Sequence, residues 1–492
     1  MRISKTSTKL LASPGAVITL FLSLPGEDRI ANVVKRVEGL SEDEVRACMD
    51  KTIRGFASRH RHLEQTLWLH FRKIAARLGS VPEARLGSVP TGFSDQKKLL
   101  LGAFFTKEYS IESAALFNPS VVPHPDQQHL KPGQLRFVMS LRATGEGHIS
   151  SIVFQTGLID SGSNVSLDQP TEYFTRLLKN EAVVYSKSFI RQRAGSNAVF
   201  DNNMLEPLPD YFTAKEAIKL LTVNRKHPAK RESIAIVQEI LDTNYELEES
   251  ADIPFNEKVI FPTAGAEKMG MEDVRFVKFE EEGNACYYGT YTAYDGKQIR
   301  THLIETEDFD VFRIRTLFGA AIADKGMALF PEKVNGKYAM ISRQGGENIN
   351  IMFSDSLYHW DEYQLLMTPK HSWELVQLGN CGSPIKTDKG WLLLTHGVGI
   401  MRTYVISAIL LDLNDPVKII GRLDQPFIEA DESEREGYVP NVVYTCGLLR
   451  HGDILLIPYA VSDSATKFIT LSLQELLDQL LAARPSGADT KK

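Results

Sequence analysis

Short apolar runs separated by turn residues dominate the chain from about residue 100 onward, and they constrain its fold more than any other feature. The runs are rich in β-branched and aromatic residues and are bounded by Gly, Asn and Asp, which is the pattern of β-strands joined by turns. One run, 287–294, is followed by Asp295-Gly296, a strong hairpin signal. The pattern predicts a mainly β fold built from many short strands.

A weak internal repeat indicates how these strands are grouped. Segment 306–312 resembles segment 354–360, and the aromatic residues that end them, Phe312 and Trp360, lie 48 residues apart. A fainter copy occurs at 411–416. Repeats of roughly this length are typical of β-propeller blades. A propeller places its loops around a central axis, where a small ligand can bind.

Helical patterns occur in two places. Ser41 and Glu44 form a capping box before apolar residues at helical spacing, which predicts one long helix over 41–78. The cluster 59–62, Arg-His-Arg-His, is expected on the solvated face of this helix rather than at a metal or basic site. Stretches 213–223 and 229–242 predict a helical insertion at about 210–245 within the β region.

A direct duplication suggests a domain boundary. Residues 76–82 are repeated at 84–90, and both copies contain Gly and Pro, as tolerant linkers do. We therefore predict a mainly helical N-terminal extension and linker at 1–95 and a β-propeller domain at 96–483. Residues 484–492 are polar and are predicted to be a disordered tail.

Composition excludes several classes of function. The chain has 492 residues, 43% of them hydrophobic, and a formal net charge of −6, so it lacks the basic excess of a general nucleic-acid binder. Its four cysteines are far apart and form no CxxC motif, which predicts no metal or redox site and favours a reducing cytoplasm. These cysteines are Cys48, Cys286, Cys381 and Cys446.

The N-terminal apolar run superficially resembles an export signal. Pro14 and Gly15 interrupt it and no Ala-x-Ala cleavage site follows, so we predict that 17–22 is a buried strand instead. The sequence contains no apolar run of 18 residues, so no transmembrane helix and no membrane partner are predicted.

Polar side chains recur at the ends of the predicted strands. In 270–275, Gly-Met-Glu-Asp-Val-Arg, an acidic pair and an arginine stand directly before an alternating apolar run. A carboxylate held near a cation and a sugar hydroxyl can act as a general acid, although six residues alone also fit a surface ion pair. Similar candidates are Asn118, Ser120, Arg142, Lys325, Arg343, His396, Tyr438, Asn441 and Asp463. Taken singly, His396 also fits a core histidine and the asparagines also fit turn residues.

In this order, the candidates resemble glycoside hydrolase family 130, the β-mannoside phosphorylases and β-mannosidases, over roughly residues 110–475. The matching motifs are Gly270–Arg275, Tyr291–Asp295, Ala328–Lys333, Ser354–Trp360, Thr395–Val398, Tyr438–Tyr444 and Ser462-Asp463. The resemblance implies a five-bladed β-propeller with the site on its axis. The helical N-terminal region resembles an accessory or oligomerisation segment, and we expect a homo-oligomer.

The resemblance also implies residue roles and an activity. The activity is an inverting phosphorolysis of β-mannosides by inorganic phosphate, which gives α-mannose 1-phosphate and needs no metal and no other cofactor. Phosphate is already anionic, so a single carboxylic acid and a set of cationic donors suffice. The implied proton donor is Asp273, acting through a mannose hydroxyl. The implied sugar ligands are Asn118, Ser120, Arg142, Arg275, Tyr438, Asn441 and Asp463, and the implied phosphate ligands are Arg343, His396 and Lys325.

Two departures from the family pattern keep alternatives open. Phosphorylases often have His-Arg-Pro where this chain has Ser-Arg-Gln at 342–344, and they tend to have a lysine near Gln377. Fewer phosphate-site cations would suit an inverting β-mannosidase, in which Glu347 or Glu436 would be the base. A third alternative, a non-catalytic glycan-binding propeller, does not explain the intact acidic residues. Retention of Arg343 and His396 favours phosphorolysis.

Overall fold

The computed structural model describes residues 1–79, 92–195, 199–222, 228–248 and 253–482. It contains two compact units: unit 1 comprises 1–12, 114–169 and 177–492, and unit 2 comprises 13–113 and 170–176. This division differs from the predicted boundary at residue 95. The reason is that the first strand pairs within unit 1, whereas the two following strand segments pair within unit 2. Most of the duplicated segment, and the predicted tail, lie outside the described residues.

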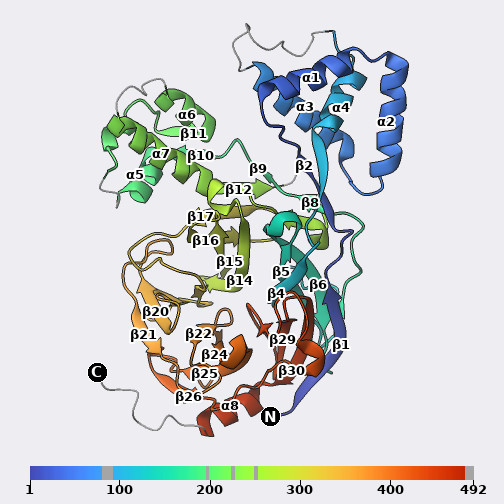
Figure 1. Cartoon of the computed structure of the whole chain (residues 1–492). Coiled ribbons are helices and arrows are strands. Elements are labelled where there is room, and N and C mark those ends of the chain that lie inside the picture. Colours follow the sequence, from blue (N-terminus) through green and yellow to red (C-terminus); the bar gives the residue numbers. More distant parts are fainter. Residues whose placement is uncertain (80–91, 196–198, 223–227, 249–252, 483–492) are drawn as a thin grey trace. The chain divides into compact units, whose positions relative to one another are not determined.

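Unit 2 combines helices with a two-stranded antiparallel ribbon (Figure 1). Strand β2 confirms the strand predicted at 17–22, and the capping box of Ser41 and Glu44 is present at the start of α2. The elements are β2 (Val17–Phe21), α1 (Glu27–Glu38), α2 (Glu42–Phe56), α3 (Leu63–Gly79), α4 (Asp95–Phe104) and β3 (Thr106–Ser110).

The prediction of one helix over 41–78 is wrong. The chain turns at 57–62, and α3 then packs with α2 and α4 around a shared apolar cluster that includes Val45, Leu67 and Leu100. The cluster 59–62 therefore lies in a turn and not on a helix face. Within it, His60 is buried, and its Nε2 lies 2.8 Å from Oε1 of Glu108 on β3.

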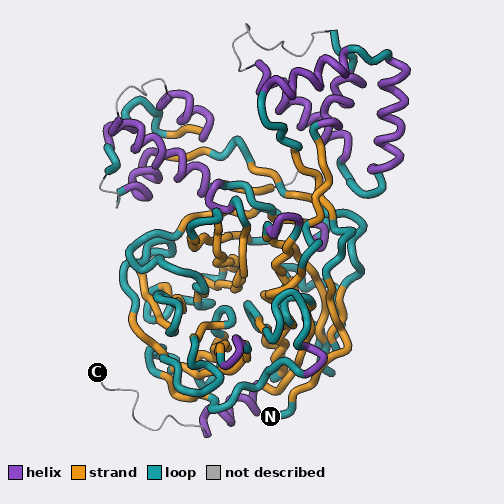
Figure 2. Tube along the Cα trace, viewed as in Figure 1, coloured by secondary structure: helices purple, strands orange, loops and turns teal. Residues whose placement is uncertain are grey.

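Unit 1 is built mainly of antiparallel β-sheets (Figure 2). In the described residues, a large sheet has the path β4-β5-β6-β14-β15-β16-β17-β12-β9, with β7 and β13 on β6. Three further sheets have the orders β18-β19-β20-β21, β22-β24-β25-β26 with β23 on β24, and β1-β30-β29-β27 with β28 on β29. No helix in the described part of the chain is long and apolar enough to cross a membrane.

The strands of the large sheet are β4 (Ala115–Pro123), β5 (Leu135–Thr144), β6 (Ser150–Ile159), β7 (Val165–Leu167), β9 (Leu178–Lys179), β12 (Tyr245–Glu248), β13 (Lys258–Ile260), β14 (Gly270–Glu281), β15 (Asn284–Tyr294), β16 (Ile299–Thr306) and β17 (Phe312–Thr316). Those of the next two sheets are β18 (Ala328–Leu329), β19 (Tyr338–Ser342), β20 (Ile349–Ser354), β21 (Gln364–Met367), β22 (Gln377–Asn380), β23 (Ile385–Lys386), β24 (Trp391–Val398), β25 (Tyr404–Leu411) and β26 (Ile419–Arg422). The last sheet contains β1 (Ile3–Leu11), β27 (Val443–Tyr444), β28 (Leu449–His451), β29 (Ile454–Val461) and β30 (Ala465–Ser472), and α8 (Leu473–Ala482) follows it.

The four sheets contact one another in a closed order. Strands β14 and β15 contact β18, β19 and β20 contact β22, β25 contacts β27, and β29 and β30 contact β4 of the large sheet. The repeat segments 306–312, 354–360 and 411–416 connect β16 to β17, β20 to β21 and β25 to β26, respectively. The sequence repeat therefore marks equivalent strand connections in three successive groups of strands.

A helical insertion with its own apolar core interrupts unit 1. Helices α6 (Ala214–Thr222) and α7 (Pro228–Thr243) confirm the two predicted helical stretches. The insertion starts earlier than the predicted residue 210, because β10 (Val184–Ser186) pairs with β11 (Tyr211–Thr213) and α5 (Lys187–Ala194) packs against α7.

The pairing of β1 with β30 generates the first prediction. Deleting residues 1–12 removes nine strand residues from this sheet and exposes the edge of β30. We expect the melting temperature to fall by at least about 2–5 °C, the size of a loss of one or a few kcal/mol. Differential scanning calorimetry checks this, with Lys9→Ala, an exposed residue of the same strand, as the control. A truncated protein that melts with the wild type would show that β1 adds no stability.

Candidate active site

Backbone irregularities place the polar residues of the site. The pairing register shifts between Phe117 and Ser120 in β4, and between Glu272 and Arg275 in β14. Within these shifts, Asn118 has φ 51° and Asp273 has φ 52°, both in the left-handed region. Asn and Asp adopt this conformation more readily than other residues with a side chain, and bulges of this kind re-aim side chains beside active sites.

The two bulges bring Asn118 and Asp273 into one hydrogen-bonded network. The Asn118 amide donates to Oδ1 of Asp273 over 2.7 Å, and Nη1 of Arg142, from β5, donates to the same oxygen over 3.1 Å. The other Arg142 terminal nitrogen donates to Oε1 of Glu272 over 2.9 Å, and its Nε donates to Ser150 over 2.8 Å. One guanidinium therefore binds two consecutive carboxylates.

The two acidic residues of the site differ in their proton affinity. Burial by itself would raise the pKa of Asp273, but the nearby charges of Arg142 and Lys325 outweigh burial and hold the pKa below its ordinary range. Burial raises the pKa of Asp463 to about 7, and the negative charge of Asp273 adds to the effect. Near neutral pH the unliganded site therefore contains one firm carboxylate and one acid close to its midpoint.

A buried histidine faces an arginine on the other side of the site. Burial, followed by the charge of Arg343, lowers the pKa of His396 far below its ordinary value, so the imidazole is neutral. Arg343 can only donate, so its Nη1 donates to Nε2 of His396 over 3.5 Å. The Nε of Arg343 is buried and has no hydrogen-bond partner among the described residues.

These groups line one polar cavity of about 320 Å³ in unit 1. Four basic side chains and two carboxylates contribute to its wall, which is notable in a chain with a net charge of −6. Seven of the predicted site residues line it: Asn118, Arg142, Asp273, Lys325, Arg343, His396 and Asp463.

Four other predicted residues do not line this cavity in the described part of the chain. The hydroxyl of Ser120 is fully buried and accepts a hydrogen bond from the backbone N–H of Phe276. Arg275 lies behind the cavity and donates to the Tyr444 hydroxyl over 2.7 Å and to the backbone carbonyl of Asp273 over 3.1 Å.

The remaining two lie at the periphery. The Tyr438 hydroxyl lies 2.8 Å from Nδ1 of His148, and its side chain is exposed. The Asn441 amide oxygen accepts a hydrogen bond from Nε of Arg435 over 2.8 Å. The geometry thus favours supporting positions for these residues.

Sequence reasoning missed Arg402, Tyr404 and Tyr444, which also line the cavity. Tyr444 belongs to a motif that was identified, but its apolar neighbours suggested a strand core. Arg402 follows the motif at 395–398 and was overlooked because the turn between two predicted strands carried no separate signal. Gln377, noted as a departure from the family, also lines the cavity.

The two carboxylates proposed as a hydrolytic base lie elsewhere. Glu347 and Glu436 are both exposed, and neither lines the cavity formed by the described residues.

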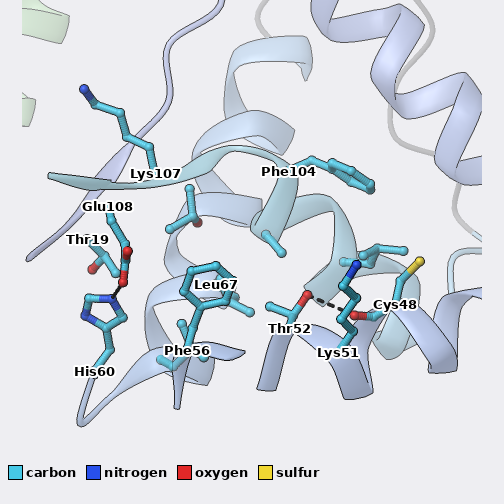
Figure 3. A pocket seen from close by; sticks show the side chains of 14 residues that line it. Thr19, Cys48, Lys51, Thr52, Phe56, His60, Leu67, Phe104, Lys107 and Glu108 are labelled. Atoms are coloured by element: carbon cyan, nitrogen blue, oxygen red, sulfur yellow. Dashed lines mark hydrogen bonds and ion pairs between the residues drawn. The ribbon is translucent and has the colours of Figure 1, made fainter. Parts of the chain in front are cut away.

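A second hollow, of about 310 Å³, lies wholly within unit 2 (Figure 3). Its wall includes Phe56, Leu67 and Phe104, and His60 points towards Glu108 at one side of it. It lacks the opposed arginines and carboxylates of the unit 1 cavity, so its chemistry does not suggest a catalytic site.

Comparison with known proteins points to one family. The family model described as beta-1,4-mannooligosaccharide phosphorylase matches residues 234–481. The chain is 34% identical over 217 residues to a 1,2-beta-oligomannan phosphorylase of Thermoanaerobacter sp. (strain X514), an alignment covering 43% of this chain and 71% of the relative. It is 32% identical over 235 residues to a beta-1,2-mannobiose phosphorylase of Listeria innocua, covering 46% of this chain and 62% of that protein.

A solved structure of the beta-1,2-mannobiose phosphorylase from Listeria innocua, in complex with beta-1,2-mannobiose, aligns with a TM-score of 0.46 and 22% identity. That alignment covers 76% of this chain and 93% of the other.

The position of His396 depends on a glycine. Gly379 of β22 pairs with His396, and a Cβ added there would lie 2.2 Å from the imidazole Cε1. We expect Gly379→Ala to displace the ring and to lower the free energy of unfolding by about 1–3 kcal/mol. Urea denaturation checks this, with Gly55→Ala, where the added methyl group meets open space, as the control. Equal stability of Gly379→Ala and wild type would refute this close approach.

The raised pKa of Asp463 predicts a pH effect on stability. Between the ordinary value of 3.8 and about 7, the folded protein holds a proton here that the unfolded chain has lost, so this residue destabilises the fold progressively as pH rises through that window. Asparagine cannot ionise, so Asp463→Asn should gain about 1–3 kcal/mol relative to wild type between pH 5 and pH 8.

Thermal melts at both pH values test this prediction. Asp388→Asn, which changes a largely exposed carboxylate, is the control and should show no such gain. A stability difference between Asp463→Asn and wild type that stays constant from pH 5 to pH 8 would contradict the shifted pKa.

Proposed function

Because the chain belongs to glycoside hydrolase family 130, we propose that it is an inverting phosphorylase that cleaves β-mannosides with inorganic phosphate and releases α-mannose 1-phosphate. The observation that carries the proposal is the lining of the unit 1 cavity, where four basic side chains surround two carboxylates. A dianionic nucleophile needs such cations, whereas attack by water needs a carboxylate base. Glu347 and Glu436 lie outside this lining.

In the proposed reaction, a phosphate oxygen attacks the anomeric carbon of the mannosyl unit from the face opposite the leaving group. The new carbon–oxygen bond forms as the glycosidic bond breaks, so the configuration inverts from β to α. The leaving oxygen takes a proton that originates from Asp273 and passes through a mannose hydroxyl. Phosphate attacks as the hydrogen phosphate ion, and its proton restores the acid after release of the products.

The low pKa of Asp273 in the unliganded site fits this sequence of events. Burial opposes the carboxylate form, and the charges of Arg142 and Lys325 maintain it. When phosphate enters, its negative charge neutralises part of this positive field, and the proton affinity of Asp273 rises. Phosphate binding would thereby prepare the acid for proton transfer.

The sugar and phosphate sides of the cavity then separate by residue. Asn118, Arg142 and Asp463 would hold the mannosyl hydroxyls, while Ser120, Arg275, Tyr438 and Asn441 would hold these residues or the rim in place. Arg343, with its buried unpartnered Nε, would bind phosphate beside Lys325, and neutral His396 would donate or accept a hydrogen bond there.

The finer architecture is part of the proposal. The closed order of sheet contacts supports a five-bladed propeller in which the large sheet supplies two blades, β4 to β7 and β14 to β17. A homo-oligomer and a cytoplasmic location stay predictions from the sequence. An inverting β-mannosidase is the alternative activity.

Product analysis distinguishes the two activities. We expect the purified protein to cleave β-1,2- or β-1,4-mannobiose only when inorganic phosphate is present, with α-mannose 1-phosphate identified by NMR spectroscopy. Asp273→Asn should lose about 10²-fold or more of the rate, because an amide cannot donate the proton. Glu347→Gln and Glu436→Gln serve as controls and should retain activity. Release of free mannose at the full rate without phosphate would establish the hydrolase instead.

A further inference from the structure

The four cations of the unit 1 cavity fall into two groups. Arg142 binds Glu272 and Asp273, and Nζ of Lys325 lies 3.9 Å from Glu272. Within the described residues, Arg343 and Arg402 form no ion pair with a carboxylate, although both line the cavity. Positive charge that the protein leaves uncompensated is therefore concentrated at these two arginines.

Arg402 occupies a defined place beside the neutral Gln377. In the sheet β22-β24-β25, Gln377 pairs with Val398, and Val398 pairs with Tyr404. Arg402 lies in the turn Ile400–Arg402 that joins β24 to β25, at the same end of the sheet. Both Gln377 and Arg402 therefore reach the cavity from one sheet edge, from opposite sides of Val398.

Ring contacts connect Arg402 to the proposed phosphate side. Its guanidinium carbon lies 5.6 Å from the centre of the Tyr404 ring, and that ring stacks on His396 with centroids 5.7 Å apart and an interplanar angle of 11°. His396 in turn accepts a hydrogen bond from Arg343. The two uncompensated arginines are thus linked through Tyr404 and His396.

The turn that carries Arg402 has an unusual backbone. Met401 and Arg402 both have φ 57°, a left-handed conformation that residues with side chains seldom adopt in succession. Ile400 and Met401 are largely exposed, while Arg402 contributes to the cavity wall. Such a conformation persists where the surrounding structure requires it, and here it directs one basic side chain to the cavity.

We propose that Arg402 is a phosphate-positioning residue that supplies, from the β24–β25 turn, the cation that Gln377 does not supply from β22. It clamps the anion opposite Arg343, which extends from the end of β19. This inference rests on the proposed phosphorylase activity and adds to it the source of the missing positive charge. It also predicts that an enzyme with a neutral residue at position 377 retains phosphate binding.

Steady-state kinetics and phosphate binding test this role. With β-1,2-mannobiose or β-1,4-mannobiose, whichever the wild type cleaves, we expect Arg402→Ala to raise the KM for phosphate about tenfold or more, with a smaller change in the KM for the sugar. Arg402→Lys should recover part of the loss. Adding Gln377→Lys to Arg402→Ala should lower the KM for phosphate again, because it restores a cation at the same sheet edge. Met401→Ala changes the same turn outside the cavity lining and should resemble wild type.

The outcomes separate this inference from the proposed function. If wild type requires phosphate but Arg402→Ala keeps its KM for phosphate within about twofold, or loses only sugar affinity, Arg402 is not the phosphate ligand. If Arg402→Ala does not fold, Arg402→Lys and the double variant still decide. Failure of Gln377→Lys to improve phosphate affinity in a folded double variant overturns the compensation. If wild type cleaves the sugar without phosphate and inorganic phosphate does not raise its melting temperature, the proposed function itself fails.

Discussion

The contact of Arg142 with two consecutive carboxylates is the interaction on which the site depends. Its guanidinium joins β5 to the bulge of β14, while its Nε holds Ser150 at the start of β6. Breaking a largely buried pair of this kind leaves an uncompensated charge, which costs more than an exposed pair contributes. Because Arg142 also keeps Asp273 ionised, it sets the contrast between Asp273 and the half-ionised Asp463. The ion pair therefore determines both the geometry and the protonation pattern of the cavity.

Local sequence signals predicted local structure well. The capping box of Ser41, strand β2 and helices α6 and α7 were found because periodicity and capping act over a few residues. The break between α2 and α3 was missed because it results from packing of α3 against α4, which spacing does not encode. The boundary of unit 2 was missed for a similar reason, since it depends on pairing of β1 with a strand more than 450 residues away in the chain.

The cavity was predictable to the extent that motifs carried it. Seven proposed residues meet there, because a resemblance fixes positions that strand alternation leaves open. Bulges at Asn118 and Asp273 shift the register by amounts that no alternation pattern reveals, so Ser120 turned out to be buried against the backbone. Arg402 escaped notice because its position depends on the left-handed backbone of a turn.

The place of β1 in the last sheet has a consequence for how the protein folds during synthesis. Residues 3–11 leave the ribosome early, yet their partner strand is 465–472. The intervening sheets can form while the chain grows, but the ring of sheet contacts cannot close until the final strands emerge. Closing so distant a contact is slow, and an unpaired strand is open to association with other chains. The long interval before closure makes this strand a natural point of chaperone protection in the nascent chain.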